Sequence, residues 1–169
     1  MTTRPATSLR RLVGASVLAA SLLVLPGTPA PAAARNEPLA ASTQAMNHRQ
    51  RVVVDHVNRA RTARSRTRIA TNGLMNRRAM NWAAELARCQ CLKHRRGPYG
   101  APRGWCAAAE NVGRSGNGGT LRGVHLAFMN SPGHRRNVLN RRWTDLGVGV
   151  ARDRQGEYFV VHAFADLHC

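Results

Sequence analysis

Apolar residues recur at helical spacing in two segments near the middle of the chain. The first predicted helix covers residues 46–64, and its apolar positions are Val53, Val57, Ala60 and Ala63. The second covers residues 74–92, and its apolar face holds Met80, Ala83, Ala84 and Ala87. Alanine predominates on this face, so we expect the second helix to be narrow and to pack closely. Residues 66–73 are predicted to be a polar connection.

The C-terminal part changes from helical to alternating patterns. Residues 93–119 are rich in Gly and Pro and predict a long irregular stretch, functional or mobile. Residues 120–129 predict a third helix, and a short helix follows to residue 139, with Ser131 as its N-cap. Residues 146–150 and 158–164 predict an antiparallel hairpin. Helices first and strands last favour an α+β layered domain over a parallel sheet.

The N-terminus has the order of a secretion signal. Three arginines precede an apolar run at residues 12–25, and small residues follow up to residue 34. We interpret residues 1–34 as a signal peptide, 35–45 as a flexible leader and 46–169 as one domain. The run is shorter than the roughly 20 residues of a membrane-spanning helix, so we expect a secreted, extracellular protein without a transmembrane anchor. An uncleaved anchor is the alternative.

Charge points to an anionic partner. The chain has 26 Lys and Arg against 8 Asp and Glu, a formal net charge of +18. Guanidinium groups, which carry nearly all of this charge, bind phosphate and carboxylate bidentately. Anionic cell-wall polymers, acidic lipids and nucleic acid are the candidate partners, and a merely solvated basic surface is the alternative. Few aromatic residues and the predicted compartment disfavour nucleic acid.

Four cysteines occur, at positions 89, 91, 106 and 169. An even number in an exported chain predicts disulfide bonds, for which three pairings exist. A Cys89–Cys91 bond is disfavoured inside a predicted helix, where the two side chains would point to different faces. Pairing Cys91 with Cys106 and Cys89 with Cys169 is therefore favoured. A cysteine-ligated zinc site is the alternative, although C-x-x-C pairs are absent.

Several motifs together resemble the CAP superfamily of cysteine-rich secretory, antigen 5 and pathogenesis-related proteins, in the short form of bacterial secreted proteins. The most specific is Ser-Pro-Gly-His-Arg-Arg-Asn at residues 131–137. The other matching pieces are residues 57–61, His94, residues 109–112, residues 128–138, residues 146–150 and Phe164. The resemblance implies an α-β-α sandwich with a small antiparallel sheet between helical layers and a surface cleft.

In the family, two histidines and two acidic residues line the cleft and hold a divalent metal in some members. By resemblance these positions fall on His94, Glu110 and His134. Ser131 stands where longer members have the second Glu, and Ala109 replaces the motif glycine. Independently of the family, two imidazoles and one carboxylate are enough for a three-ligand zinc site with an open position. Purely structural roles for all three residues are the alternative.

Two classes of function remain open from the sequence. The first is a non-enzymatic, monomeric binding module for an anionic, lipidic or sterol-like ligand, as the family implies. The second is a hydrolase, dependent on a metal or on Ser131 as nucleophile, with His134 as base and Glu110 orienting it. The H-E-x-x-H motif of metalloproteases is absent. His162 is expected on the last strand, where it could face the cleft.

Overall fold

A computed structural model describes residues 45–97 and 99–168, which form one α+β domain. The predicted signal peptide and nearly all of the predicted leader lie outside the described residues. The elements in chain order are α1 (His48–Thr62), β1 (Ala70–Thr71), α2 (Gly73–Cys89), β2 (Ala107–Arg114), α3 (Leu121–Asn130), α4 (Pro132–Leu139), β3 (Asp145–Arg152) and β4 (Tyr158–Asp166).

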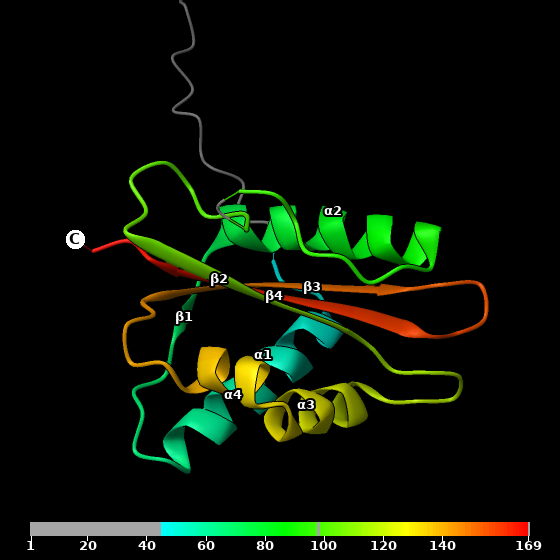
Figure 1. Cartoon of the computed structure of the whole chain (residues 1–169), viewed down its shortest axis with the longest axis horizontal. Helices are drawn as coiled ribbons and strands as arrows, with labels where there is room; N and C mark the ends of the chain where they lie inside the picture. Colours follow the sequence, from blue (N-terminus) through cyan, green and yellow to red (C-terminus); the bar gives the residue numbers. More distant parts are fainter. Residues whose placement is uncertain (1–44, 98, 169) are drawn as a thin grey trace, which may run out of the picture. The chain divides into compact units, whose positions relative to one another are not determined.

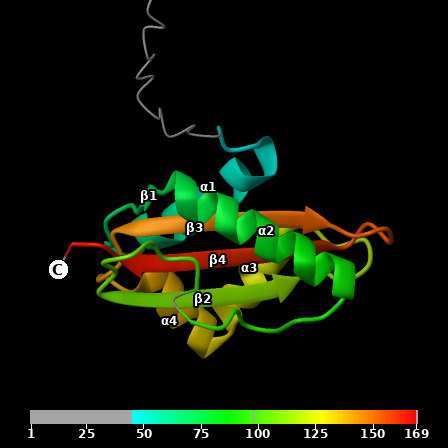
Figure 2. The ribbon, with the colours of Figure 1, turned by 90° about the horizontal axis from the view of Figure 1, so that it is seen from above.

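The sheet lies between two helical layers (Figures 1 and 2). Helix α2 covers one face, and α1, α3 and α4 cover the other. This confirms the expected α-β-α sandwich. The strand order is β1-β3-β4-β2, in which β3, β4 and β2 pair antiparallel and the two-residue β1 pairs parallel to β3. The sheet is therefore mixed rather than purely antiparallel.

Strand β2 lies within the segment that was predicted to be irregular. Its eight residues pair with β4 along their whole length, from Ala107 opposite Asp166 to Arg114 opposite Phe159. Three alanines, a glutamate and an asparagine make its local sequence a poor strand former. The long pairing with β4 thus overrides weak local propensity. The prediction of an irregular stretch was wrong for these residues.

Helix α2 lies in direct contact with the backbone of β3. A Cβ atom built on Gly149 would lie 2.0 Å from the carbonyl oxygen of Ala79, and one on Gly147 would lie 2.6 Å from the Met75 backbone. Real Cβ atoms do not approach backbone so closely. The two glycines and the small side chains at Ala79 and Ala83 therefore let this helix rest on the strand. The expected close packing of the alanine-rich helix is confirmed.

The opposite layer depends on buried polar side chains of α1. Arg61 is 1% exposed, and its guanidinium donates to the carbonyl oxygens of Thr67, Val138 and Asn140, each at 2.8 Å. Two of these carbonyls lie at the C-terminal end of α4, where the helix dipole favours a cation. Asn58 binds both backbone groups of Ile69. These contacts join α1 to α4 and to the chain leading into β1.

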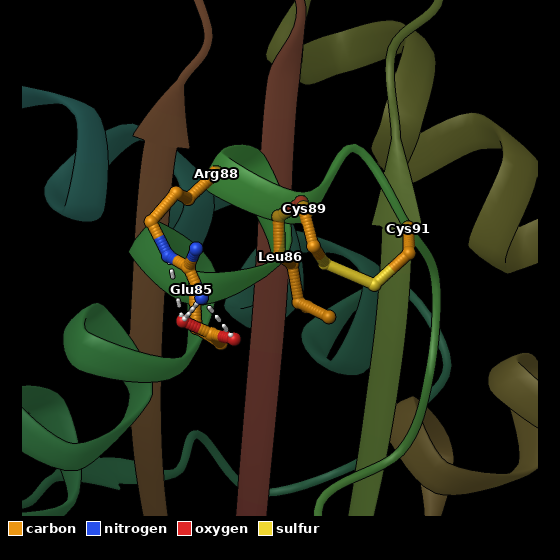
Figure 3. The surroundings of a disulfide bond; sticks show 5 residues. All are labelled: Glu85, Leu86, Arg88, Cys89 and Cys91. Carbon is orange, nitrogen blue, oxygen red and sulfur yellow. Dashed lines mark hydrogen bonds and ion pairs between the residues drawn. A yellow bond between two sulfur atoms is a disulfide. The ribbon is translucent and has the colours of Figure 1, made fainter.

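A disulfide bond at the C-terminal end of α2 joins Cys89 to Cys91 (Figure 3), with the two Cα atoms 5.2 Å apart. The predicted pairings of Cys91 with Cys106 and of Cys89 with Cys169 were therefore wrong. Helix α2 ends at Cys89 rather than at residue 92, because Gln90 adopts the left-handed conformation and turns the chain back. The bond was disfavoured because two helical side chains at this spacing point to different faces, but Cys91 lies outside the helix and is not bound by that rule. Cys106 is also disulfide-bonded, and Cys169 lies outside the described residues.

We predict that Gly149→Ala lowers the free energy of unfolding by about 3 kcal/mol, because the new methyl group collides with helix backbone that cannot move aside. Gly133→Ala is the matched control, since a Cβ there meets nothing within 4 Å. Urea unfolding followed by circular dichroism measures both. Equal stability of the two variants would show that α2 does not depend on this contact.

Candidate functional site

Glu110 and His94 meet beside the edge strand β2. The Nδ1 atom of His94 lies 2.8 Å from Oε1 of Glu110, and the backbone N–H of Arg95 donates to the same oxygen at 3.0 Å. The Glu110 side chain is 1% exposed, whereas that of His94 is 58% exposed. Burial raises the pKa of Glu110, and the hydrogen bonds from Arg95 and His94 oppose this shift. The pair therefore joins an exposed imidazole to a buried carboxylate.

Two asparagines attach α4, the helix of His134, to the other side of β2. Asn111 is fully buried and its side chain donates to the carbonyl oxygen of His134 at 3.1 Å. Asn137 donates to Oδ1 of Asn111 at 2.9 Å and accepts from the Trp143 indole through its carbonyl at 2.8 Å. Sequence reasoning missed this role, although both asparagines lie within the matched motifs. Their side chains hold His134 at the edge of the sheet.

His134 packs on an aromatic ring that also contacts a second histidine. The centre of its ring lies 5.0 Å from the centre of the Phe128 ring. The Phe128 ring in turn lies 4.8 Å from the ring of His162. Burial lowers the pKa of His134, and the nearby His94 lowers it further. His162 is fully buried, and neither of its ring nitrogens has a hydrogen-bond partner among the described residues. The expectation that His162 could face the cleft was therefore wrong.

The alternation of side chains along β2 places Glu110 with His94 on one face of the strand and α4, which carries His134, on the other. Successive residues of a strand point to opposite faces. Val112 packs in the cluster beneath α2 and Glu110 shares its face, whereas Asn111 points to α4. Within residues 45–97 and 99–168, no three His, Cys, Asp or Glu side chains lie close enough to hold one metal ion. The structure thus joins His94 to Glu110 without adding His134, and metal binding by the three stays a prediction.

The alternative nucleophile, Ser131, begins α4 as its N-cap residue. Its side chain makes no capping hydrogen bond, so the expected capping contact is absent at this helix, which has Pro132 in its first turn. No hydrogen bond joins Ser131 to His134 in the described part of the chain, and Glu110 binds His94 instead. A Ser-His-Glu relay is not assembled in this conformation.

Comparisons with known proteins agree with this fold. A model of the cysteine-rich secretory protein family, named CAP, matches residues 54–164, more than half of the chain. The chain belongs to the CAP family. None of the CAP domain's helices within the described residues has the length and apolar character to cross a membrane. No match is found among curated protein sequences.

Solved structures with the same fold come from distant relatives. An outer surface protein from Borrelia burgdorferi aligns with a TM-score of 0.59 and 15% identity, over 69% of this chain and 90% of its own. An extracellular protein with an SCP domain from Bacillus anthracis aligns with a TM-score of 0.57 and 22% identity, over 69% of this chain but 40% of its own. NaASP2, solved with Zn²⁺, aligns with a TM-score of 0.54 and 16% identity, over 72% of this chain and 81% of its own. These identities show a shared fold.

We predict that buried His162 makes the CAP domain sensitive to acid. Burial lowers its pKa from 6.5 to about 3. Between these two pH values His162 is therefore protonated in the unfolded chain and neutral in the folded chain. The free energy of unfolding should then fall between pH 6.5 and 3, by a total on the order of 4 kcal/mol. Urea unfolding across this range measures the loss.

His162→Leu should flatten this pH dependence, whereas His48→Leu, at an exposed position, should leave it unchanged. Any slope that persists in His162→Leu is expected from His125, whose pKa burial lowers to about 4, and from His134 and His56, whose pKa values burial also lowers. An unchanged slope in His162→Leu would contradict the assignment.

Proposed function

We propose that this CAP domain is an exported, non-catalytic binding module for anionic ligands outside the cell. The observation that carries the proposal is the excess of positive charge. With 26 basic side chains and 8 acidic ones, the carboxylates can neutralise at most a minority of the guanidinium groups. A surface with so large a surplus of positive charge attracts anions through long-range electrostatic forces. Dissolved salt screens this attraction.

The acidic side chains are largely committed to internal contacts, which strengthens this argument. Glu85 pairs with Arg88 at 2.8 Å, and Asp166 pairs with Arg142 at 2.8 Å. Glu110 is buried against His94. These carboxylates are therefore not available to mask other arginines. Family membership supports export, since the family is described as secretory and one structural neighbour is an extracellular protein.

The geometry around His134 supports binding over hydrolysis. A hydrolase of the Ser131 type needs the hydroxyl, the imidazole and the carboxylate in one hydrogen-bonded chain. Here the carboxylate of Glu110 is bonded to His94, and the ring of His134 packs on Phe128. To build the relay, Glu110 would have to release His94 and bond to His134 instead. The binding module requires no such rearrangement.

A divalent metal at the two histidines is the second candidate, favoured by the bond between His94 and Glu110. Metal-ligating histidines commonly bond one ring nitrogen to a carboxylate, which orients the other nitrogen toward the metal. The Nδ1 contact of His94 with Glu110 matches this arrangement and leaves Nε2 as the ligand atom, with His134 as its partner. Glu110 would then position His94 rather than bind the metal. The neighbour NaASP2 was solved with Zn²⁺.

We predict that the chain beginning at Arg35 sediments with phosphatidylglycerol vesicles and not with phosphatidylcholine vesicles. The bound fraction should fall at least about tenfold between 50 and 500 mM NaCl, because salt screens exposed charges. Co-sedimentation measures both effects. Equal binding to the neutral vesicles, or binding that salt leaves unchanged, would favour an apolar, sterol-like or lipid-binding groove instead.

For the metal, we predict that Zn²⁺ binds with one site per chain in calorimetry, and that His94→Ala/His134→Ala abolishes the binding. Glu110→Gln should weaken it by about 10- to 100-fold, as expected when an orienting carboxylate is lost. His48→Ala/His168→Ala, at two exposed histidines, is the matched control. Undetectable binding, or equal binding by both double variants, would rule out the metal site.

A further inference from the structure

A surface pocket with a volume of about 460 Å³ lies where the start of α1, the loop before α3 and the β3–β4 hairpin meet. Its charged and aromatic lining residues are His48, Arg49, His56, Arg122, Arg152 and Tyr158. None of the lining residues in the described part of the chain is acidic. The pocket therefore gathers three guanidinium groups from three different elements, with no carboxylate of residues 45–97 or 99–168 in its lining.

Tyr158 holds two of these arginines together. The Cζ atom of Arg152 lies 5.3 Å from the centre of the Tyr158 ring, and that of Arg49 lies 5.9 Å from it. Arg152 is further held by a hydrogen bond from its Nε to the carbonyl oxygen of Gly156 at 2.8 Å. Cation–π contacts of this kind orient the guanidinium groups and leave other N–H groups available. The two arginines are thus positioned before any ligand arrives.

The first turn of α3 adds positive potential to the same pocket. Thr120 caps this helix by accepting a hydrogen bond from the backbone N–H of Gly123 at 3.1 Å, and no acidic residue lies in the first turn. Arg122 projects from that turn and is exposed. The N-terminal end of the helix carries partial positive charge, which adds to the three guanidinium groups.

The two carboxylates of the β3–β4 hairpin are engaged in other contacts. Oδ1 of Asp153 accepts from the backbone N–H of Glu157 at 2.8 Å within the hairpin. Oε1 of Glu157 accepts from the backbone N–H of Gly116 at 2.6 Å and lies 3.6 Å from Arg114. Asp55, on α1, acts to raise the pKa of His56, against the larger effects of burial, Arg59 and Arg122. The three pocket arginines therefore keep their charge uncompensated by the hairpin.

We infer that this pocket binds the phosphate group of a phosphate ester. The inference rests on the proposed function and assigns it a site and a ligand class. A carboxylate offers two oxygens and one charge, which leaves two of the three guanidinium groups unmatched. A phosphate monoester carries about −1.5 to −2 charge and three acceptor oxygens, and guanidinium groups bind it bidentately. The Tyr158 ring provides an apolar wall for the esterified group.

The test measures binding of sn-glycerol 3-phosphate to the chain beginning at Arg35, by calorimetry at constant ionic strength. Arg49→Gln/Arg122→Gln/Arg152→Gln should weaken binding at least about tenfold. The matched control is Arg68→Gln/Arg96→Gln/Arg103→Gln, which removes the same charge at exposed positions outside the pocket and should change the affinity less than about twofold. Arg122→Gln alone should give a smaller loss, which keeps the test valid if the triple variant does not fold.

Three further arms separate the sources of the phosphate. Glycerate, with a carboxylate in place of phosphate, should bind at least about tenfold more weakly. Inorganic phosphate binding as well as the ester would assign the site to free phosphate, and binding to vesicles of phosphatidic acid, whose headgroup is a phosphate monoester, would assign it to a lipid headgroup. Equal losses in the two triple variants, or glycerate binding as well as the ester, would overturn the inference while the proposed function stands. Failure of the unsubstituted chain to bind any anionic probe would overturn the proposed function itself.

Discussion

The contact between α2 and β3 positions much of the domain. Because Gly147 and Gly149 present no side chains, α2 rests directly on the strand, and from there it crosses the sheet diagonally toward β2 (Figure 2). The helix ends at Cys89, and its disulfide with Cys91 lies near the edge strand (Figure 3). The chain that leaves the helix at this point brings His94 to Glu110. A larger residue in the strand would lift the helix and displace His94.

The opposite layer is held by polar side chains that bind backbone. Arg61 binds the end of α4, and Asn58 binds the chain before β1. Asn111 and Asn137 then join the same helix to β2. Buried polar groups are costly unless all their hydrogen bonds are made, so these contacts specify one arrangement of α4. Much of the matched family motif therefore builds the scaffold that carries His134.

Two separate places on the domain bear on its function. Beside β2, the strand's alternation sends Glu110 to His94 and Asn111 to α4, which favours a histidine oriented by a carboxylate over a three-residue catalytic relay. At the β3–β4 hairpin, arginines converge around Tyr158, and the pocket lining has no acidic side chain among the described residues. The first place carries the family's characteristic residues. The second follows from this chain's own excess of arginine.

The sequence by itself determined the four main helices, the β3–β4 hairpin, the basic character and the kinship through residues 131–137. These depend on local periodicity, turn residues and composition, which are readable along the chain. Tertiary structure alone decided that β2 is a strand, that His162 is buried and that Cys89 pairs with Cys91. Their causes are a distant strand partner, the packing of Phe128, and a left-handed residue that ends a helix early. Such causes act across space or through a single dihedral angle, and hydrophobic spacing does not record them.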